Sequence, residues 1–277
     1  MEILELEKKV IHLKKEVMQL VYDAKTGHTG SDLSCADILV ALYYEIMNVD
    51  PKNAKDENRD RYIQSKGHAA EILWLILADK GFFPKTDLKT FSQYKSNYIG
   101  HPNNKVNGIE MNTGSLGHGL SLSVGSALAA KLDNKDFHTY TLMGDGELAE
   151  GSVWEGAMAA AHYKLDNLTA IIDYNQLQIT GNIKDIMSSA PLAQKWEAFG
   201  WQVIEINGNN MSELIAALKA IPQKDKPTMI IANTVKGNGV SDATNVASWH
   251  HHVPSDEELA KALKELDQQL EVLNHVK

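Results

Sequence analysis

Two oxygen-bearing side chains follow apolar runs in the second half of the chain. Asp145 stands between Gly144 and Gly146, directly after one such run, and Asn175 follows the run 168–173. Neighbouring parallel strands would bring both side chains to one edge of a sheet, where glycines let a phosphate approach the backbone closely. Carboxylate and amide oxygens are hard ligands that suit Mg²⁺ or Ca²⁺. The pattern therefore predicts a metal and phosphate site, although Gly-Asp-Gly alone is equally typical of a plain strand-to-helix turn.

Several histidines sit beside glycines, and three of them form the second feature with chemical potential. They are His28, His68 and His101, and the chain has 11 histidines in all. Imidazole titrates near neutrality, so a histidine in a loop of this kind suits proton transfer. A lone histidine is more often a surface or core residue, so the placement becomes informative only with further matches.

The elements that must position these residues alternate between strands and helices. Strands are predicted over 138–143, 168–173, 202–206 and 228–233, and helices over 153–162, 193–199 and 212–220. Such alternation is typical of right-handed βαβ crossovers. The expected fold class is α/β, with a parallel central sheet covered by helices on both faces.

The first half of the chain is predicted to be mainly helical. Apolar positions at three- and four-residue steps indicate a helix over 2–25, and further helices are expected over 31–47 and 69–80. Ser31 or Asp32 would cap the second of these helices.

The remaining segments suggest one domain. Residues 84–112 are polar and are expected to run over the surface, and 255–274 should form a closing helix. Ser255 and Glu258 have the spacing of a capping box at its start. No linker or low-complexity segment divides the chain, so residues 1–277 are expected to form a single domain.

Composition excludes several classes of protein. Lys plus Arg number 27 against 36 Asp plus Glu, giving a net charge of −9, and no dense basic cluster suggests nucleic acid or a membrane surface. The one cysteine, Cys35, excludes an intramolecular disulfide and a CxxC zinc site, and it is expected to be a packed core thiol. No apolar run approaches the roughly 18 residues of a membrane span, and the charged N-terminus lacks a signal-peptide pattern. The expected location is cytoplasmic.

Several motifs, taken together and in order, resemble the N-terminal third of transketolase. They are 26–30 (TGHTG, like SGHPG), 58–61 (NRDR, like NRDRF), 65–68 (SKGH, like SxGH), 100–102 (GHP), 113–117 (TGSLG, like TGPLG) and 144–151 (GDGELAEG, like GDGCLMEG). Residues 147–174 lie between Gly146 and Asn175, which is the spacing of the thiamine diphosphate motif in this family. The resemblance covers nearly the whole chain.

The resemblance implies a site for thiamine diphosphate and Mg²⁺, with Ca²⁺ or Mn²⁺ as possible replacements. Asp145, Asn175 and the backbone carbonyl of Leu177 would be the metal ligands. The residues implied to contact the cofactor are His68, Gly114, Ser115, Leu116, Gly144, Asp145, Gly146, Glu147, Asn175 and His250. The metal and neutral-to-cationic histidines would offset the charge of the diphosphate.

The resemblance also implies catalytic residues. His28 and His101 match histidines that face the substrate, and His250 matches a third one. Glu150 matches a carboxylate network that couples two cofactor sites, although a carboxylate at a helix N-terminus is also common for structural reasons. Ser115 and His118 stand where the family has proline and glutamine, and His251 and His252 are expected to be solvated.

The pyrimidine-binding and C-terminal domains of transketolase have no counterpart here, so the resemblance implies that a second chain supplies them. The implied function is the N-terminal subunit of a transketolase that transfers a two-carbon ketol unit between sugar phosphates in an α2β2 assembly. Two alternatives stay open. One is a component of another thiamine diphosphate enzyme, such as a 2-oxo acid dehydrogenase α subunit or a relative of deoxyxylulose phosphate synthase. The other is a non-catalytic, cofactor-binding regulatory protein.

Overall fold

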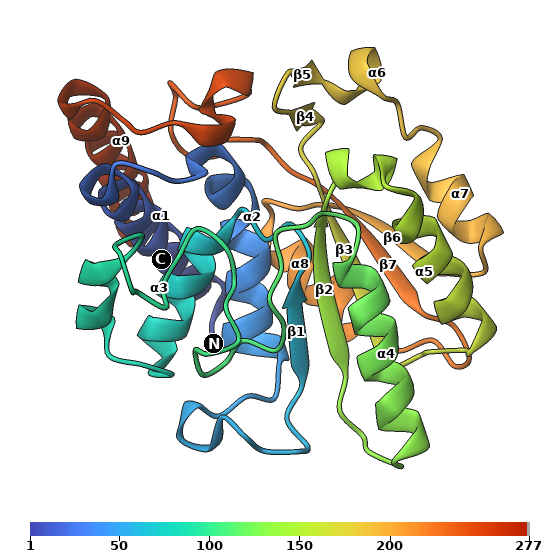
Figure 1. The fold of residues 1–277 in the computed structure, drawn as a ribbon. Helices are drawn as coiled ribbons and strands as arrows, with labels where there is room; N and C mark the ends of the chain where they lie inside the picture. Colours follow the sequence, from blue (N-terminus) through green and yellow to red (C-terminus); the bar gives the residue numbers. More distant parts are fainter. Residues whose placement is uncertain (276–277) are drawn as a thin grey trace.

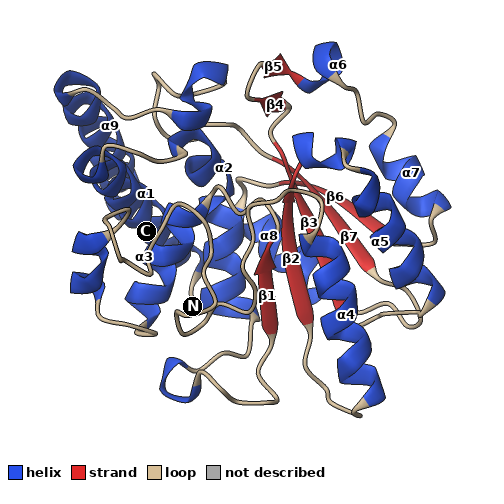
Figure 2. Ribbon diagram, in the orientation of Figure 1, coloured by secondary structure: helices blue, strands red, loops and turns tan. Residues whose placement is uncertain are grey.

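The computed structural model describes residues 1–275 and is built around a parallel sheet (Figures 1 and 2). The strand order is β1-β2-β3-β7-β6, and every neighbouring pair is parallel. The strands are β1 (Arg61–Gln64), β2 (Thr139–Gly144), β3 (Leu168–Tyr174), β7 (Thr228–Asn233) and β6 (Gln202–Asn207). The predicted α/β fold class is confirmed.

Helices cover both faces of this sheet (Figure 2). Ile171 and Ile230 face one core, whereas their neighbours Ile172 and Ile231 face the other, as the two-residue period of a strand requires. The first core is formed with α1 (Ile3–Ala24), α2 (Thr29–Ala41), α3 (Ala70–Lys80) and α8 (Met211–Lys219). The second is formed with α4 (Gly119–Leu132), α5 (Gly151–His162) and α7 (Leu192–Ala198).

The last long helix, α9 (Asp256–His275), packs beside α1 at the edge of the molecule (Figure 1). The predicted capping box is present, because the Ser255 N–H donates to Glu258 and the Glu258 N–H donates to Ser255 Oγ at 3.1 Å. Among residues 1–275, no helix has the length and apolar character that crossing a bilayer requires.

Short elements shape the loops around the sheet. A hairpin of β4 (Leu177–Gln178) and β5 (Gly181–Asn182) with α6 (Ile183–Ile186) lies near the end of β3 (Figure 1). The remaining short helices are η1 (Leu42–Ile46), η2 (Pro51–Asn53), η3 (Lys85–Thr90), η4 (Gly146–Ala149) and η5 (Ala247–His251).

Two features differ from the sequence-based expectation. The second helix begins at Thr29 with His28 as its N-cap residue, so neither Ser31 nor Asp32 caps it. Asp32 instead accepts a hydrogen bond from the Ile72 N–H of α3, at 3.2 Å. Strand β1 was not predicted, because it has only four residues and begins with a charged arginine. Cys35 is fully buried, as expected.

Candidate active site

A cavity of about 470 Å³ opens at the ends of β2 and β3. Loops from both halves of the chain converge on it, and most residues singled out for cofactor binding lie in its wall. The lining residues are His28, Ser31, Lys66, His68, Gly114, Leu116, Gly144, Asp145, Gly146, Glu147, Asn175, Leu177, Gln178, Ile179, Thr180, Lys236 and His250. This is the position at which open α/β sheets bind ligands.

Asp145 and Asn175 are neighbours because β2 and β3 pair with Gly144 opposite Asp173. This confirms the expected adjacency. Asp145 is almost completely buried, and its carboxylate accepts from the N–H groups of Gly146 and Gln176. Burial, and then the nearby charge of Asp173, raises the pKa of Asp145 to about 7. A bound cation would offset both effects.

The turn after β3 adds two oxygen donors, from Asn175 and Leu177, to the Asp145 carboxylate that follows β2. The Asn175 side-chain oxygen accepts from the Leu177 N–H at 3.1 Å, and the Leu177 carbonyl accepts from Lys236 Nζ at 3.2 Å. Gln176 lies between them with φ of 62°, a left-handed conformation that usually favours glycine. One carboxylate, one amide oxygen and one carbonyl form a donor set that fits Mg²⁺ or Ca²⁺.

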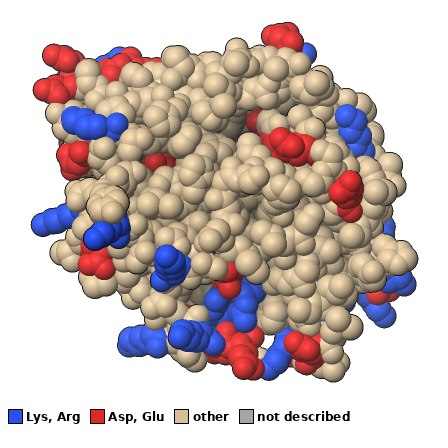
Figure 3. Space-filling model, viewed as in Figure 1, with Lys and Arg blue, Asp and Glu red and all other residues tan. Residues whose placement is uncertain are grey.

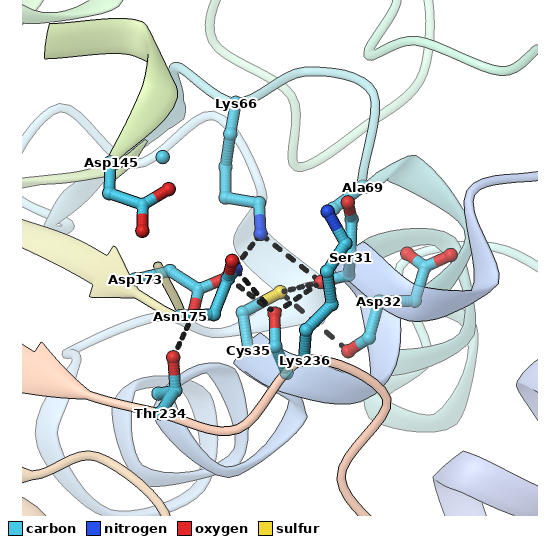
Figure 4. Close-up of polar contacts among 12 residues, drawn as sticks. Ser31, Asp32, Cys35, Lys66, Ala69, Asp145, Asp173, Asn175, Thr234 and Lys236 are labelled. Carbon is cyan, nitrogen blue, oxygen red and sulfur yellow. Dashed lines mark hydrogen bonds and ion pairs between the residues drawn. The ribbon is translucent and has the colours of Figure 1, made fainter. Parts of the chain in front are cut away.

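A buried ion pair lies beneath these donors (Figure 4). The Lys66 ammonium contacts the Asp173 carboxylate, and the two side chains are 1% and 0% exposed. Asp173 also accepts from the hydroxyls of Ser34 and Thr234, and Lys66 donates to the Ser31 carbonyl at 3.1 Å. Although burial opposes the ammonium form, Asp173 keeps the pKa of Lys66 above its usual value. The pair thus joins α2 to the ends of β1, β3 and β7.

Lys236 is the second lysine of the cavity, on the loop after β7. Its ammonium lies 2.8 Å from His250 Nδ1. Burial, and then the charge of Lys66, lowers the pKa of Lys236 to about 8. Because Asp173 compensates the charge of Lys66, the ammonium of Lys236 is the group of the cavity wall that favours an anionic ligand. Sequence reasoning missed both residues, although Lys66 lies within the SKGH motif and Lys236 begins a Lys-Gly-Asn-Gly turn.

Four histidines that the sequence analysis singled out lie together. The His28 ring centroid is 5.2 Å from that of His68, 5.7 Å from that of His250 and 6.2 Å from that of His101, whereas His68 and His250 are 5.1 Å apart. Burial lowers all four pKa values, to about 4 for His28 and about 3 for His250. The lowered pKa values favour the neutral end of the expected neutral-to-cationic range for these histidines.

The loop 113–117 places a glycine directly against one of these rings. Gly114 has φ of 128°, and a Cβ there would lie 2.4 Å from His101 Cδ2. Only glycine fits this contact, so His101 packs against Gly114, which lines the cavity, although His101 itself is not among the lining residues. Leu116 lines the cavity, whereas Ser115 and His118 are exposed outside it.

The two glutamates of the GDGELAEG segment have different surroundings. The buried Glu147 carboxylate accepts from Ser65 Oγ, from the Gly117 N–H at 2.8 Å and from the Gly144 N–H at 3.1 Å. It therefore ties loops of the cavity together. Glu150 is exposed before α5 and does not line the cavity.

The two histidines after His250 also differ. His251 is exposed, as expected, yet its ring lies 4.7 Å from that of His28. His252 is half-buried, contrary to expectation, because it pairs with Glu258 at 3.0 Å and lies against Trp249.

The matching family model and several similar proteins all point to the same enzyme family. The family model described as transketolase, thiamine diphosphate binding domain, matches residues 7–272. The chain is 48% identical over 261 residues to an apulose-4-phosphate transketolase subunit of Phocaeicola vulgatus, covering 94% of this chain and 93% of that one. It is 39% identical over 259 residues to 6-deoxy-6-sulfo-D-fructose transketolase subunit SqwG of Clostridium sp., covering 93% and 94%.

Longer relatives contain this chain as a part. Human transketolase is 38% identical over 240 residues, covering 86% of this chain but 38% of its own length. Transketolase from Leishmania mexicana superposes with a TM-score of 0.86 at 27% identity, covering 99% of this chain and 45% of that one. For Campylobacter jejuni transketolase the TM-score is 0.84 at 30% identity, with coverage of 99% and 48%. The chain thus spans less than half of these solved structures.

Proposed function

Because the chain belongs to the family of transketolase thiamine diphosphate-binding domains, we propose that it is the N-terminal subunit of a two-chain transketolase. The observation that carries this proposal is the cavity, in which a hard-oxygen donor set and two lysines lie side by side. Relatives of similar length to this chain are named as transketolase subunits, which supports the existence of a second chain. We further propose that residues 1–277 form one domain and that the enzyme is a cytoplasmic α2β2 assembly.

The cavity fits thiamine diphosphate with Mg²⁺. The raised pKa of Asp145 marks a buried carboxylate whose charge a metal ion would stabilise. Asp145, Asn175 and the Leu177 carbonyl would hold the metal, while Lys236, His68 and His250 would contact the diphosphate. When bound, thiamine diphosphate supplies the carbanion chemistry of ketol transfer. The contribution of this chain is to bind and orient its diphosphate end.

His28 and His101 would act on the sugar. Both are neutral near pH 7 because burial lowers their pKa values, so each can accept a proton from a hydroxyl group and return it. We assign Glu150 no contact with substrate within this chain, because it is exposed and outside the cavity. Its position before α5 suits contact with another subunit.

Exposed apolar side chains near the cavity support a partner subunit. On the segment 179–187, Ile179 is 70% exposed and Met187 is 64% exposed. On α5, Met158 is also exposed, at 54%, whereas Val153 and Ala157 are fully buried in the core. The face drawn in Figure 3 carries most of its charges at the rim, with a largely uncharged centre. Such a surface suits a protein interface.

A ketol-transfer assay on the assembled enzyme tests this function. The chain is mixed with the separately purified partner, Mg²⁺ and thiamine diphosphate, and ketose donors are supplied one at a time. The panel includes xylulose 5-phosphate, apulose 4-phosphate and 6-deoxy-6-sulfofructose, because relatives are named with these sugars. We expect turnover with at least one of these ketoses. Binding of cofactor without any ketol transfer would favour a non-catalytic protein.

A further inference from the structure

Two carboxyl groups outside the metal donor set lie together in the interior. Asp32 in the first turn of α2 and Glu71 in the first turn of α3 are both 0% exposed, and Asp32 lies against the start of α3, where its carboxyl group is close enough to that of Glu71 for a hydrogen bond if one of them is protonated. Two neighbouring carboxylates that are both buried away from water cannot both be ionised. The hydrogen bond therefore requires a proton that the two groups share.

Few other donors form hydrogen bonds to the carboxyl oxygens of this pair. Asp32 Oδ1 accepts from the Ile72 N–H at 3.2 Å. Within residues 1–275, Asp32 Oδ2 and both Glu71 oxygens have no further donor in hydrogen-bonding geometry, although the N–H groups of His28 and Ala70 lie close to Glu71. Leaving buried carboxyl oxygens in this state is costly, so the two groups depend on each other.

The position of the pair links it to the cavity. Helix α2 begins directly after His28, and α3 begins two residues after His68. Glu71 also packs under the loop that carries His28, because a Cβ on Gly27 would lie 2.9 Å from Glu71 Oε1. A contact between the two first turns therefore fixes the two histidines relative to each other.

We propose that Asp32 and Glu71 form a proton-sharing clamp that joins the first turns of α2 and α3 and thereby positions His28 and His68 in the cavity. Both are positioning residues, since neither lines the cavity. Only the kinetic test of this inference rests on the proposed function.

The clamp has a pH dependence of defined sign. Burial, and then the charge of Glu71, raises the pKa of Asp32, and burial raises the pKa of Glu71. The other titratable groups facing the pair are Lys66, Cys35 and His28, and Lys66 is held by Asp173. The unfolded chain releases both protons near the ordinary values of 3.8 and 4.5, whereas the folded chain retains at least one. Stability from the clamp is therefore complete below about pH 4 and falls as pH rises through the folded-state values.

Thermal unfolding of the chain at pH 5 and pH 8 tests the shared proton. The Glu71→Gln variant keeps the hydrogen bond, because its amide donates to Asp32 without needing a titratable proton. We expect the Tm of the wild type to fall between these pH values by at least about 2 °C more than that of Glu71→Gln. The change in Tm between the two pH values should be the same in Asp32→Asn as in Glu71→Gln. As a control, Glu197→Gln, at an exposed position of α7, should show the same change in Tm as the wild type. An equal change in Tm between pH 5 and pH 8 in all four proteins would overturn the proposal that Asp32 and Glu71 share a proton.

Kinetics of the assembled enzyme test the positioning role. Glu71→Leu keeps the bulk of the side chain and removes the hydrogen bond, so kcat should fall by at least about tenfold through displacement of His28. Glu71→Gln should retain most of the wild-type kcat, since it keeps the hydrogen bond. Wild-type kcat in Glu71→Leu, or an equal loss in both variants, would contradict the clamp. If Glu71→Leu does not fold, Asp32→Leu takes its place, with the same fall in kcat expected and Asp32→Asn as the variant that keeps the hydrogen bond and most of the kcat. Absence of ketol transfer in the wild type would reject the proposed function while leaving the thermal result standing.

Discussion

The Lys66 ammonium and the Asp173 carboxylate form an ion pair that is almost completely removed from solvent at the floor of the cavity. Asp173 lies two residues before Asn175, and Lys66 lies two residues before His68. The pair therefore connects the donor set for a metal with one of the histidines proposed to contact a diphosphate.

Breaking this pair should destabilise the fold strongly. Lys66→Met leaves the buried Asp173 charge without its partner, so the free energy of unfolding should fall by about 3–5 kcal/mol. Lys131→Met removes a partly exposed pair with Asp166 and should cost at most about 1 kcal/mol. Urea unfolding of both variants measures the difference. Equal losses in the two variants would show that burial of the Lys66 pair has no special effect.

Asp145→Asn should weaken cofactor binding. The substitution keeps the size of the side chain, but it removes the charge and replaces one of the two acceptor oxygens with an NH2 donor. We expect the affinity of the assembled enzyme for thiamine diphosphate in the presence of Mg²⁺ to fall at least tenfold, or about 1.4 kcal/mol. Calorimetric titration measures this change, with Asp136→Asn as a control on the loop that precedes β2. An unchanged affinity in Asp145→Asn would reject the metal assignment.

Lys236→Met should reduce the same affinity for a different reason. The methionine keeps the length of the side chain but removes an ammonium group from the cavity wall, so we expect at least a tenfold loss for the cofactor, again about 1.4 kcal/mol. Lys184→Met, at an exposed position on α6, is the matched control. If both variants bind the cofactor like the wild type, Lys236 does not contact the anion.

His28→Ala and His101→Ala should separate turnover from cofactor binding. Both rings belong to the histidine group but neither is placed among the metal ligands, so cofactor affinity should stay near the wild-type value. The kcat of the assembled enzyme should fall by about 10²–10⁴-fold, which is typical for loss of a positioned acid–base group. Steady-state kinetics paired with calorimetry give both quantities. Full turnover in both variants would remove these histidines from the proton transfers.

The sequence allowed the fold and the adjacency of Asp145 and Asn175 to be predicted, because these depend on local patterns. Asp145 and Asn175 follow apolar strands, and parallel strand order alone brings them together. The ion pair of Lys66 with Asp173 was not predictable in this way, since lysine is usually exposed and only tertiary packing buries it. Asp32 was misassigned for a similar reason, because a helix-capping pattern cannot reveal that its carboxyl group reaches the neighbouring helix.

The central claim is that this chain provides one half of an active site and that a second polypeptide completes it. A coupled ketol-transfer assay tests the claim most directly, using the purified chain with excess Mg²⁺ and thiamine diphosphate, with and without the partner. The account predicts no turnover by the chain alone. Turnover should appear on addition of the partner, together with a rise in cofactor affinity. Robust turnover by the chain without a second polypeptide would contradict the account.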